Sequence, residues 1–485
     1  MLSFAGKQQC EDPRTGLTAF GPYSRTESSR SNNIRVGIVG PAEAIDRTVA
    51  FLSQLGQRIE PSGRTDAVLH PAFPGINLEE PFQIELVTQP IWHRSLRPKD
   101  LALIENHPDF MERIGLLLRA VITEMKALQN LDSRPDVVIC AMSKSLEELC
   151  RVGIAAYDRQ QAETDDGIDP EDLADLLPEE EASTDDDEID TDAARSFRRG
   201  LKAECLKLFP TQLMWHRTLA GTAGVQDMAT RAWNLMVALL YKSEIIPWRL
   251  TDVIEGSCFV GVSFFHEDQA KSSKLRTSVA QAFTERGEGF VLQGDSFEWD
   301  SKESGDKAPH LNHDQAKTLL KKVLKMYDDQ IGGLPRKVVL HKTSRYTEEE
   351  RKGFEAALEG VSHYGLLTIT RRGIFCLRPG KKAALRGTVV DFGQKCGLVY
   401  TMGYVPFLRC YPGFRVPQPL EVTENWGSVS LQEAAQDLLK LTKLNWNTAA
   451  FNCRDPITIA FSRRVGDILK MAKGKDPALH YRYYM

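Results

Sequence analysis

Residues 257–265 read SCFVGVSFF, an apolar run that opens the C-terminal part of the chain. Its aromatic and β-branched side chains favour a strand that packs inside a core. Helical periodicity follows at 314–328, 347–358, 430–442 and 457–471, and further apolar runs stand between these segments, at 337–341, 365–370, 374–380, 387–392 and 397–404. The C-terminal part is therefore expected to be a meander of strands with helices interspersed.

That pattern is typical of an RNase H-like fold, which we expect over residues 251–485. The N-terminal part differs, because the apolar runs IRVGIVG (34–40), PFQIELV (81–87) and PDVVICAM (135–142) alternate with helical patterns at 43–55, 110–130 and 144–152. Such alternation predicts a parallel sheet with helices on both faces. The expected fold class is α/β, with a Rossmann-like domain followed by an RNase H-like domain.

Length and composition limit the kinds of protein that this chain can be. Its 485 residues, 42% hydrophobic and 26% charged, suit two or three domains. The nine cysteines are scattered without a CxxC pair, which argues against a zinc ribbon. Their odd number and the lack of a secretory signal favour a reducing cytoplasm. No apolar run approaches the ~18 residues of a transmembrane helix.

The charge is unevenly distributed. Residues 158–192 contain 17 acidic residues and one basic residue, so this segment carries −16 and the other 450 residues carry +11. We expect the segment to be a solvated, mostly disordered insert in a domain that spans residues 33–250. The polar, Ser- and Arg-rich residues 1–32 are expected to be a flexible arm. The basic remainder favours a polyanionic partner, although an ordinary basic surface would have the same composition.

Two constellations of residues could carry chemistry, and the first is a set of phosphate-type ligands. Arg198 and Lys202 are four residues apart on a predicted helix and so share one face. Gln212 follows at the helix exit, and Lys242 ends a later helix. A terminal phosphate needs converging donors of these kinds. The alternative is a solvated helix face and a lysine that complements a helix dipole.

The second constellation is the place where a two-metal nuclease of RNase H-like fold would hold its carboxylates. The first strand has Ser263 where an aspartate would be needed, and residues 342–345 (KTSR) and 460–464 (AFSRR) contain no acid. His266, Glu267 and Asp268 follow the first strand but are displaced from this position. Serine and threonine cannot hold two Mg²⁺ ions, because hard cations prefer charged oxygen ligands. A nucleotide-binding enzyme in residues 34–152 is a weaker alternative, since residues 37–40 (GIVG) lack the GxGxxG pattern.

Several blocks of the chain together resemble the Argonaute family. FVGVSFF, VVLHKTSRYTEEER, RGTVVDF, PGFRVPQPLEVTENWG and NWNTAAFNCRDPITIAFSRRVGDIL look like a PIWI domain, and FRRGLKAECLKLFPTQ with AWNLMVALLYKSEIIPW looks like a MID domain. The blocks cover roughly residues 195–485. No room remains for the amino-terminal and PAZ domains, so the chain is similar to the short prokaryotic Argonautes, built from MID and PIWI domains only.

The resemblance implies a site for the 5′-phosphate of a guide strand. The matching positions are Arg198, Lys202, Gln212 and Lys242, and Arg198 departs from the usual aromatic residue or histidine. The family also uses its C-terminal carboxylate, here that of Met485, through a divalent ion at the same phosphate. Mg²⁺ is therefore the expected cofactor.

The resemblance also implies that the PIWI domain is catalytically inactive. Ser263, Thr343 and Phe461 occupy three positions of the family's metal-binding tetrad, and the glutamate finger cannot be placed. Short Argonautes of this kind act with a partner that joins an APAZ region to an effector, commonly a sirtuin-like or TIR NADase. The implied function is cytoplasmic recognition of invading single-stranded DNA through a guide RNA, which activates that partner. The alternative is a PIWI-type nuclease with a non-standard metal site that uses Glu267 or Asp268.

Basic residues of the C-terminal domain are expected to line a nucleic-acid channel. The predicted channel residues are Lys271, Lys274, Arg276, Lys342, Arg345, Arg371, Arg372, Arg463 and Arg464. The acidic insert could compete with nucleic acid or bind a partner, or it could be an inert linker.

Overall fold

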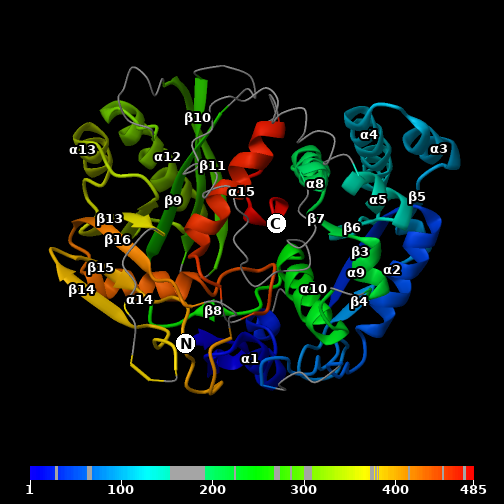
Figure 1. Cartoon of the computed structure of the whole chain (residues 1–485), viewed down its shortest axis with the longest axis horizontal. Helices are drawn as coiled ribbons and strands as arrows, with labels where there is room; N and C mark the ends of the chain where they lie inside the picture. The colour runs from blue at the N-terminus through cyan, green and yellow to red at the C-terminus, as the bar shows by residue number, and fades with distance from the viewer. Residues whose placement is uncertain are drawn as a thin grey trace. The chain divides into compact units, whose positions relative to one another are not determined.

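The computed structural model describes residues 1–27, 31–62, 68–152, 192–222, 225–266, 274–284, 287–299, 308–371, 376, 379–380, 382–412, 416–450, 453–472 and 477–485 (Figure 1). The chain forms two compact units. Unit 1 contains Met1–Thr26, Ile246–Trp446 and Ala450–Tyr484, and unit 2 contains Glu27–Ile245, Asn447–Ala449 and Met485. The predicted domain boundary after residue 250 thus lies five residues beyond the transition at Ile245.

Unit 2 is a parallel sheet flanked by helices. Its strands are β3 (Asn33–Gly40), β4 (Glu85–Val87), β5 (His93–Ser95), β6 (Val137–Ala141) and β7 (Thr211–Met214). The order is β4-β3-β6-β7, β5 also pairs with β3, and each of these pairs is parallel. Its helices are α2 (Ala42–Gln54), α3 (Pro98–Asn106), α4 (Phe110–Gln129), α5 (Lys144–Val152), α8 (Asp192–Cys205), α9 (His216–Ala220) and α10 (Met228–Lys242). The Rossmann-like prediction is therefore confirmed.

Helix α4 shows how the sequence specifies this unit. Asp109 caps its first turn by accepting a hydrogen bond from the Glu112 amide at 2.8 Å. Residues Leu117, Val121 and Met125 recur at helical spacing and are fully buried. They join the core that strand β6, which is buried along its whole length, also enters. A buried strand and an apolar helix face thus stabilise each other by removing apolar surface from water.

Unit 1 is built on a mixed sheet of eight strands. They are β9 (Ser257–His266), β10 (Lys274–Thr284), β11 (Gly289–Glu298), β12 (Lys337–Lys342), β13 (His363–Thr370), β14 (Val389–Gly393), β15 (Cys396–Val399) and β16 (Leu420–Gly427). The order is β11-β10-β9-β12-β13-β16-β15-β14, and β12 runs parallel to both β9 and β13. The main helices are α12 (His313–Ile331), α13 (Glu348–Ala357), α14 (Leu431–Leu441) and α15 (Ile457–Met471).

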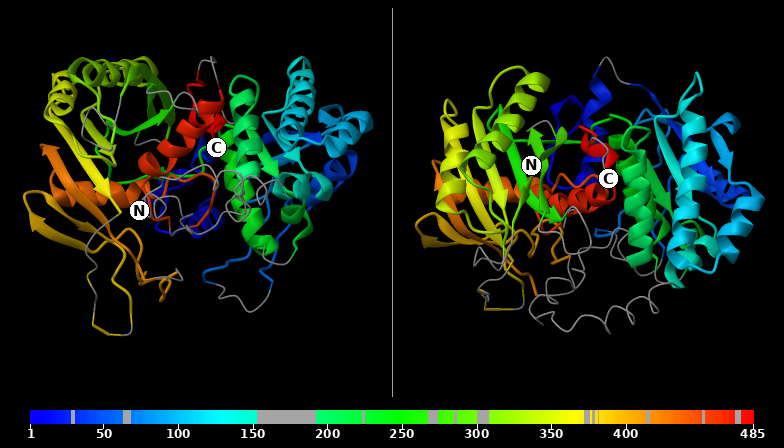
Figure 2. Two further views of the ribbon diagram at one scale, coloured as in Figure 1. Left: turned by 45° about the horizontal axis from the view of Figure 1, so that its top comes forward. Right: turned by 90° about the horizontal axis from the view of Figure 1, so that it is seen from above.

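Helices cover both faces of the central strands of unit 1 (Figure 2). Cys258, Val260 and Val262 of β9 enter one core with residues of α12 and α13. Gly261 faces the opposite side, where a Cβ atom would lie 2.0 Å from the Thr458 carbonyl oxygen of α15. Only glycine therefore permits this approach of helix to strand. The period-two alternation of β9 places Ser263 on the same side as Gly261, toward α15.

The first residues of the chain do not form the flexible arm predicted for 1–32. Strand β1 (Leu2–Ser3) pairs with both β2 (Gln9–Cys10) and β8 (Arg249–Leu250), and helix α1 spans Pro13–Phe20. Leu2, Phe4 and Leu17 are fully buried. The ring of Phe4 lies 6.4 Å from that of Trp248. The prediction was wrong because a few apolar residues in a polar segment are enough to fix it when distant parts of the chain supply their core.

Two long strands, β10 and β11, were not predicted. Their sequences, KLRTSVAQAFT and GFVLQGDSFE, contain too many polar residues to form an apolar run. Both pair antiparallel with their neighbours, and antiparallel strands can leave one face to solvent, so they need no such run. The acidic insert predicted at 158–192 lies outside the described residues except for Asp192, the first residue of α8. Among the helices that the structure describes, none is long and apolar enough to cross a membrane.

Candidate nucleic-acid interface

Lys202 lies at the centre of the predicted phosphate site in unit 2. Phe197, Leu201 and Cys205 of α8 recur every four residues and enter the core, which fixes the rotation of this helix. Lys202 follows Leu201 and is only 2% exposed. Its ammonium group donates a hydrogen bond to the backbone oxygen of Thr211, the first residue of β7. A buried ammonium group needs such acceptors, because its desolvation is costly.

Lys242 reaches the same point from another element. It is the last residue of α10, a helix with buried residues along its whole length, and it is 2% exposed. Its ammonium group donates to the side-chain oxygen of Gln212, whose amide nitrogen donates to the Leu213 carbonyl at 3.3 Å. Thr211 and Gln212 are neighbours in sequence. Two buried lysines from two helices therefore meet at consecutive residues of one strand.

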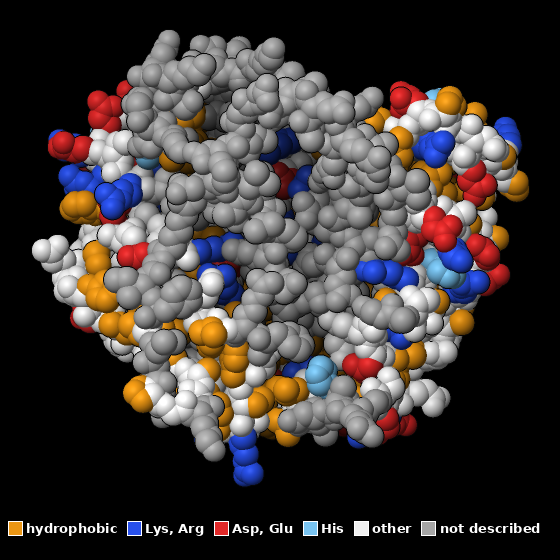
Figure 3. All heavy atoms as spheres, in the orientation of Figure 1, with side chains coloured by type: hydrophobic (Ala, Val, Ile, Leu, Met, Phe, Trp, Pro, Cys, Tyr) orange, Lys and Arg blue, Asp and Glu red, His pale blue; other side chains and the backbone are white. Residues whose placement is uncertain are grey.

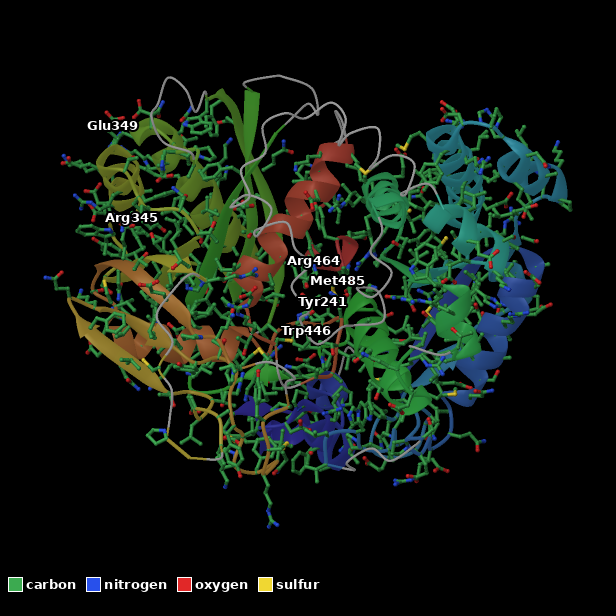
Figure 4. The ribbon with its side chains drawn as sticks, in the orientation of Figure 1. Tyr241, Arg345, Glu349, Trp446, Arg464 and Met485 are labelled. Carbon is green, nitrogen blue, oxygen red and sulfur yellow. The ribbon has the colours of Figure 1, made fainter. Side chains whose placement is uncertain are left out.

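The other two predicted phosphate ligands belong to the same unit. Arg198 is half-buried on α8, one helical turn before Lys202. Met485 is 1% exposed and is grouped with unit 2. The C-terminus lies beside α8 and α10 in all three views of the ribbon (Figures 1 and 2), and Met485 lies near Tyr241 in Figure 4. The structure thus joins Lys202, Gln212 and Lys242 through β7 and places Arg198 and Met485 nearby.

A divalent ion at this site would receive few ligands from the protein. Among the residues that the structure describes, no group of three or more His, Cys, Asp and Glu side chains is arranged to hold a metal ion. The Met485 carboxylate is a hard oxygen ligand, and Mg²⁺ is often bound through one or two carboxylates together with phosphate oxygens and water. The donors fit an ion that arrives with a phosphate.

Gln212 also borders an open pocket in unit 2. Arg231, Asn234 and Ala238 of α10 line it at the spacing of one helix face, which continues to Lys242. Arg231 is 7% exposed, donates to the Thr218 carbonyl and lies 5.7 Å from the centre of the Phe51 ring. The pocket thus lies along the same face of α10 as Lys242.

In unit 1, two of the three residues that the resemblance matches to the tetrad are engaged in packing, and the third is exposed. The Ser263 hydroxyl donates to the Ser462 carbonyl of α15 at 3.0 Å. Phe461 is 2% exposed and packs edge-on against Tyr481, with ring centres 4.3 Å apart. Thr343 is exposed just beyond the end of β12. Glu267 and Asp268, the acids of the alternative metal site, lie outside the described residues, and His266 ends β9.

Lys342 was predicted to line a nucleic-acid channel, and this prediction was wrong. The residue is buried inside unit 1. Its side chain is 1% exposed and forms an ion pair with Glu350 of α13, which is fully buried. The Lys342 ammonium group also lies 3.4 Å from His310 Nδ1 and 5.3 Å from the Tyr346 ring centre. Glu350 neutralises the charge, so Lys342 contributes to packing and not to a basic surface. The apolar residues VVL at the centre of KVVLHK indicated a buried strand. Nothing in the sequence around Glu350 indicated that this residue is buried.

His341 precedes this lysine and is also fully buried. Its Nδ1 lies 2.7 Å from the Thr458 hydroxyl of α15. Burial, helped by the positive charge of Lys337, lowers the pKa of His341 to about 3. The imidazole is therefore neutral at physiological pH and links β12 to α15.

The other predicted channel residues are spread over unit 1. Arg371 forms an ion pair with the buried Asp455. The Arg464 guanidinium lies 5.6 Å from the Phe461 ring centre on α15, and Arg345 is exposed near α13 (Figure 4). The remaining residues are Lys274 and Arg276 on β10, Arg463 on α15, and Lys271 and Arg372, which lie outside the described residues. Among the members of this set whose side chains the structure describes, Arg345 is exposed and Arg464 is half-buried.

Comparisons with known proteins identify the fold. No protein-family model and no curated protein matches the chain. The crystal structure of Argonaute from Aquifex aeolicus matches with a TM-score of 0.57 and 15% identity, over 100% of this chain and 54% of that one. Clostridium butyricum Argonaute bound to a guide DNA and a 19-mer target DNA matches with a TM-score of 0.60 and 12% identity, over 99% and 53%.

These matches extend over both units. The chain spans about half the length of these Argonaute structures. At 12–15% identity the likeness is one of fold. The chain has the α/β fold of Argonaute proteins, with a Rossmann-like MID domain followed by an RNase H-like PIWI domain.

Proposed function

We propose that this chain binds a guide RNA by its 5′-phosphate and presents the guide for pairing with single-stranded DNA. The observation that carries this proposal is the convergence of buried Lys202 and Lys242 on Thr211 and Gln212. Two ammonium groups and an amide in a desolvated site suit a phosphate dianion, because charge-assisted hydrogen bonds are stronger away from water. Arg198 adds a guanidinium group, and the Met485 carboxylate would hold a Mg²⁺ ion against the phosphate.

Specificity for the target would come from base pairing. A guide held at its 5′ end exposes its following bases to a complementary strand, while the protein contacts the backbone, as in other RNA-guided systems. The solved neighbour from Clostridium butyricum holds a guide DNA and a target DNA. A DNA guide is therefore the appropriate comparison for the RNA guide that we propose.

The chain would not cut its target. Ser263, Thr343 and Phe461 supply two hydroxyl groups and a ring, and two-metal hydrolysis needs charged oxygens. We infer that catalysis lies in a partner subunit that joins an APAZ region to an effector domain. A sirtuin-like effector is our first candidate, and a TIR domain is the second. Pairing with invading DNA would activate this effector, deplete NAD and abort the infection in a prokaryotic cytoplasm.

The test compares the affinity of the purified chain for one RNA with a 5′-phosphate or a 5′-hydroxyl group. We expect the phosphorylated RNA to bind at least 100-fold more tightly, and Lys202→Met to reduce that preference. Lys207→Met is the matched control, because Lys207 is exposed just beyond the same helix. Equal affinity for the two RNAs, with the chain alone and with its co-expressed partner, would overturn the proposal.

A further inference from the structure

We propose that Asn234 is a positioning residue of the phosphate site, because it clamps a segment from the C-terminal part of the chain along the pocket beside Gln212. This segment consists of residues Asn447–Ala449, and we call it the strap. The inference rests on the proposed function, since it takes a 5′-phosphate as the ligand of the lysine pair. It adds the contacts of the strap as a condition for tight binding of that phosphate.

The strap leaves unit 1 and returns to it after three residues. Trp446 before it and Ala450 after it are grouped with unit 1, whereas the strap itself is grouped with unit 2. Thr448 is 4% exposed and Ala449 is 1% exposed. The strap forms neither a helix nor a strand, so its buried polar groups need hydrogen-bond partners from other elements of unit 2.

Asn234 of α10 supplies these partners. Its side-chain oxygen accepts hydrogen bonds from the Thr448 hydroxyl at 3.0 Å and from the Ala449 backbone amide at 3.1 Å. The Ala449 amide can only donate, so the oxygen of Asn234 must face the strap. Its side-chain nitrogen then donates to the Gln226 side-chain oxygen at 3.1 Å. Two bonds thus hold the strap, and the third fixes the orientation of the Asn234 amide.

Helix α10 is a firm support for this clamp. Asp227 caps its first turn by accepting a hydrogen bond from the Ala229 amide at 3.0 Å. Trp233, which precedes Asn234, is 1% exposed, and its indole N–H donates to the Pro71 carbonyl at 3.2 Å. The backbone of Asn234 therefore cannot shift without disturbing a buried aromatic ring.

The strap and the lysine pair border the same pocket. Asn447 lines it together with Gln212, Asn234 and Ala238, and among the described residues that border it Asn447 alone comes from beyond residue 245. Asn234, Ala238 and Lys242 share one face of α10 at a spacing of four residues, which puts Asn234 about 12 Å of helix before Lys242. A ligand that is held at Lys242 and extends along this face meets the strap.

The strap affects how water reaches the Gln212 amide, which accepts the hydrogen bond of Lys242. Charge-assisted hydrogen bonds weaken when water competes for their donors and acceptors. A strap that Asn234 no longer holds would leave the pocket beside Gln212 open to water, and a bound phosphate would lose part of its interaction energy. An uncharged 5′-hydroxyl group has little to lose, so the preference for the 5′-phosphate would fall.

The surface of unit 2 does not offer a substitute for the buried pair. Figure 3 shows the Lys and Arg side chains over the outer helices α2, α3 and α4 interspersed with Asp and Glu side chains. Opposite charges at short range largely cancel their attraction for a phosphate. The preference for a 5′-phosphate therefore reports on the enclosed site, and a change in the strap should be visible in it.

The test measures the Kd values of one RNA with a 5′-phosphate or a 5′-hydroxyl group for three variants of the full chain. Asn234→Leu removes both strap bonds, Thr448→Val removes one at nearly constant shape, and Thr448→Ser is the matched control that keeps the hydroxyl group. We expect the preference for the 5′-phosphate to fall at least fivefold in Asn234→Leu and at least threefold in Thr448→Val. We expect Thr448→Ser to change it less than twofold.

Hydrogen exchange on the same proteins shows whether the strap was released. The Ala449 amide should exchange at least tenfold faster in Asn234→Leu, while the amides of β6 keep the exchange rates of the unmodified chain. If β6 also exchanges faster, Asn234→Leu has lost its fold, and the comparison of Thr448→Val with Thr448→Ser decides.

Two results would overturn the inference and leave the phosphate site intact. One is an unchanged preference in Asn234→Leu although the Ala449 amide exchanges faster, because the strap would then be structural only. The other is an equal loss in Thr448→Val and Thr448→Ser, because the hydroxyl group would then be irrelevant. Failure of the proposed function is read separately, as equal affinity of the unmodified chain for the two RNAs.

Discussion

The substitution Lys242→Met tests the phosphate site most sharply. Methionine keeps the apolar stem of the lysine and removes its charge, so the packing of α10 is retained. The change removes the hydrogen bond of the ammonium group to Gln212, which contributes about 1.5–3 kcal/mol, but it also removes the cost of burying that charge and leaves no buried charge unpaired. The variant should therefore fold.

The magnitude follows from the burial of the two lysines, each 2% exposed. A hydrogen bond to a charged group contributes about 1.5–3 kcal/mol. Two such bonds predict that a 5′-phosphate is preferred over a 5′-hydroxyl by ~3–6 kcal/mol, which is a factor of ~10²–10⁴. Loss of one of them reduces the preference by ~10- to 150-fold.

The assay measures the Kd values of one RNA with and without its 5′-phosphate, for the unmodified chain, Lys242→Met and the exposed control Lys207→Met. The ratio of the two Kd values is insensitive to the fraction of folded protein, because both RNAs meet the same preparation. A ratio for Lys242→Met within threefold of the unmodified chain would refute the assignment of this lysine to the phosphate site.

Three further predictions concern unit 1. Glu350→Ala should lower the free energy of unfolding by about 3–5 kcal/mol in urea titrations, since it leaves Lys342 buried without a counter-charge, and the double variant with Lys342→Met should recover at least half of the loss. Because burial lowers the pKa of His341 to about 3 while the unfolded chain binds a proton near pH 6.5, stability should fall by ~1.4 kcal/mol per pH unit as the pH decreases from 6.5 toward 3. The ΔG of unfolding, measured at pH 7 and pH 5, should therefore fall more for the unmodified chain than for His341→Gln. An equal fall in the two proteins would mean that the histidine already titrates in the folded state. Guide-loaded protein should leave a labelled complementary DNA intact with Mg²⁺ or Mn²⁺, and Ser263→Asp alone should not start cleavage; metal-dependent products from the unmodified chain would contradict the inactive assignment.

The sequence predicted those parts of the fold that depend on local pattern. Apolar runs marked β9 and β12, and helical periodicity marked α4 and α15, because buried strands and amphipathic helices carry their signal within one segment. Strand β1 could not be predicted, since Leu2 pairs with Leu250 across almost the whole of the intervening domain. Strand β1 has two residues, which are too few to show a periodic pattern of apolar side chains.

The candidate site was predicted in part for a similar reason. Helical spacing placed Arg198 and Lys202 on one face, and Gln212 and Lys242 were candidates as further phosphate-type donors. The resemblance to Argonautes then matched all four positions to one site. What spacing could not supply is the meeting of two helices at the start of β7. It also could not reveal that Glu350 neutralises Lys342, because the local sequence of a lysine at the end of a strand does not show which distant residue will pair with it.

The most direct measurement of the central claim is the identity of the nucleic acid that the chain carries. The protein, with its partner co-expressed, is purified from cells, and the bound nucleic acid is extracted and end-labelled with and without prior phosphatase treatment. We predict short RNA that accepts label only after the phosphatase has removed its 5′-phosphate. A complex that contains no nucleic acid and ignores added 5′-phosphorylated guides would contradict the account.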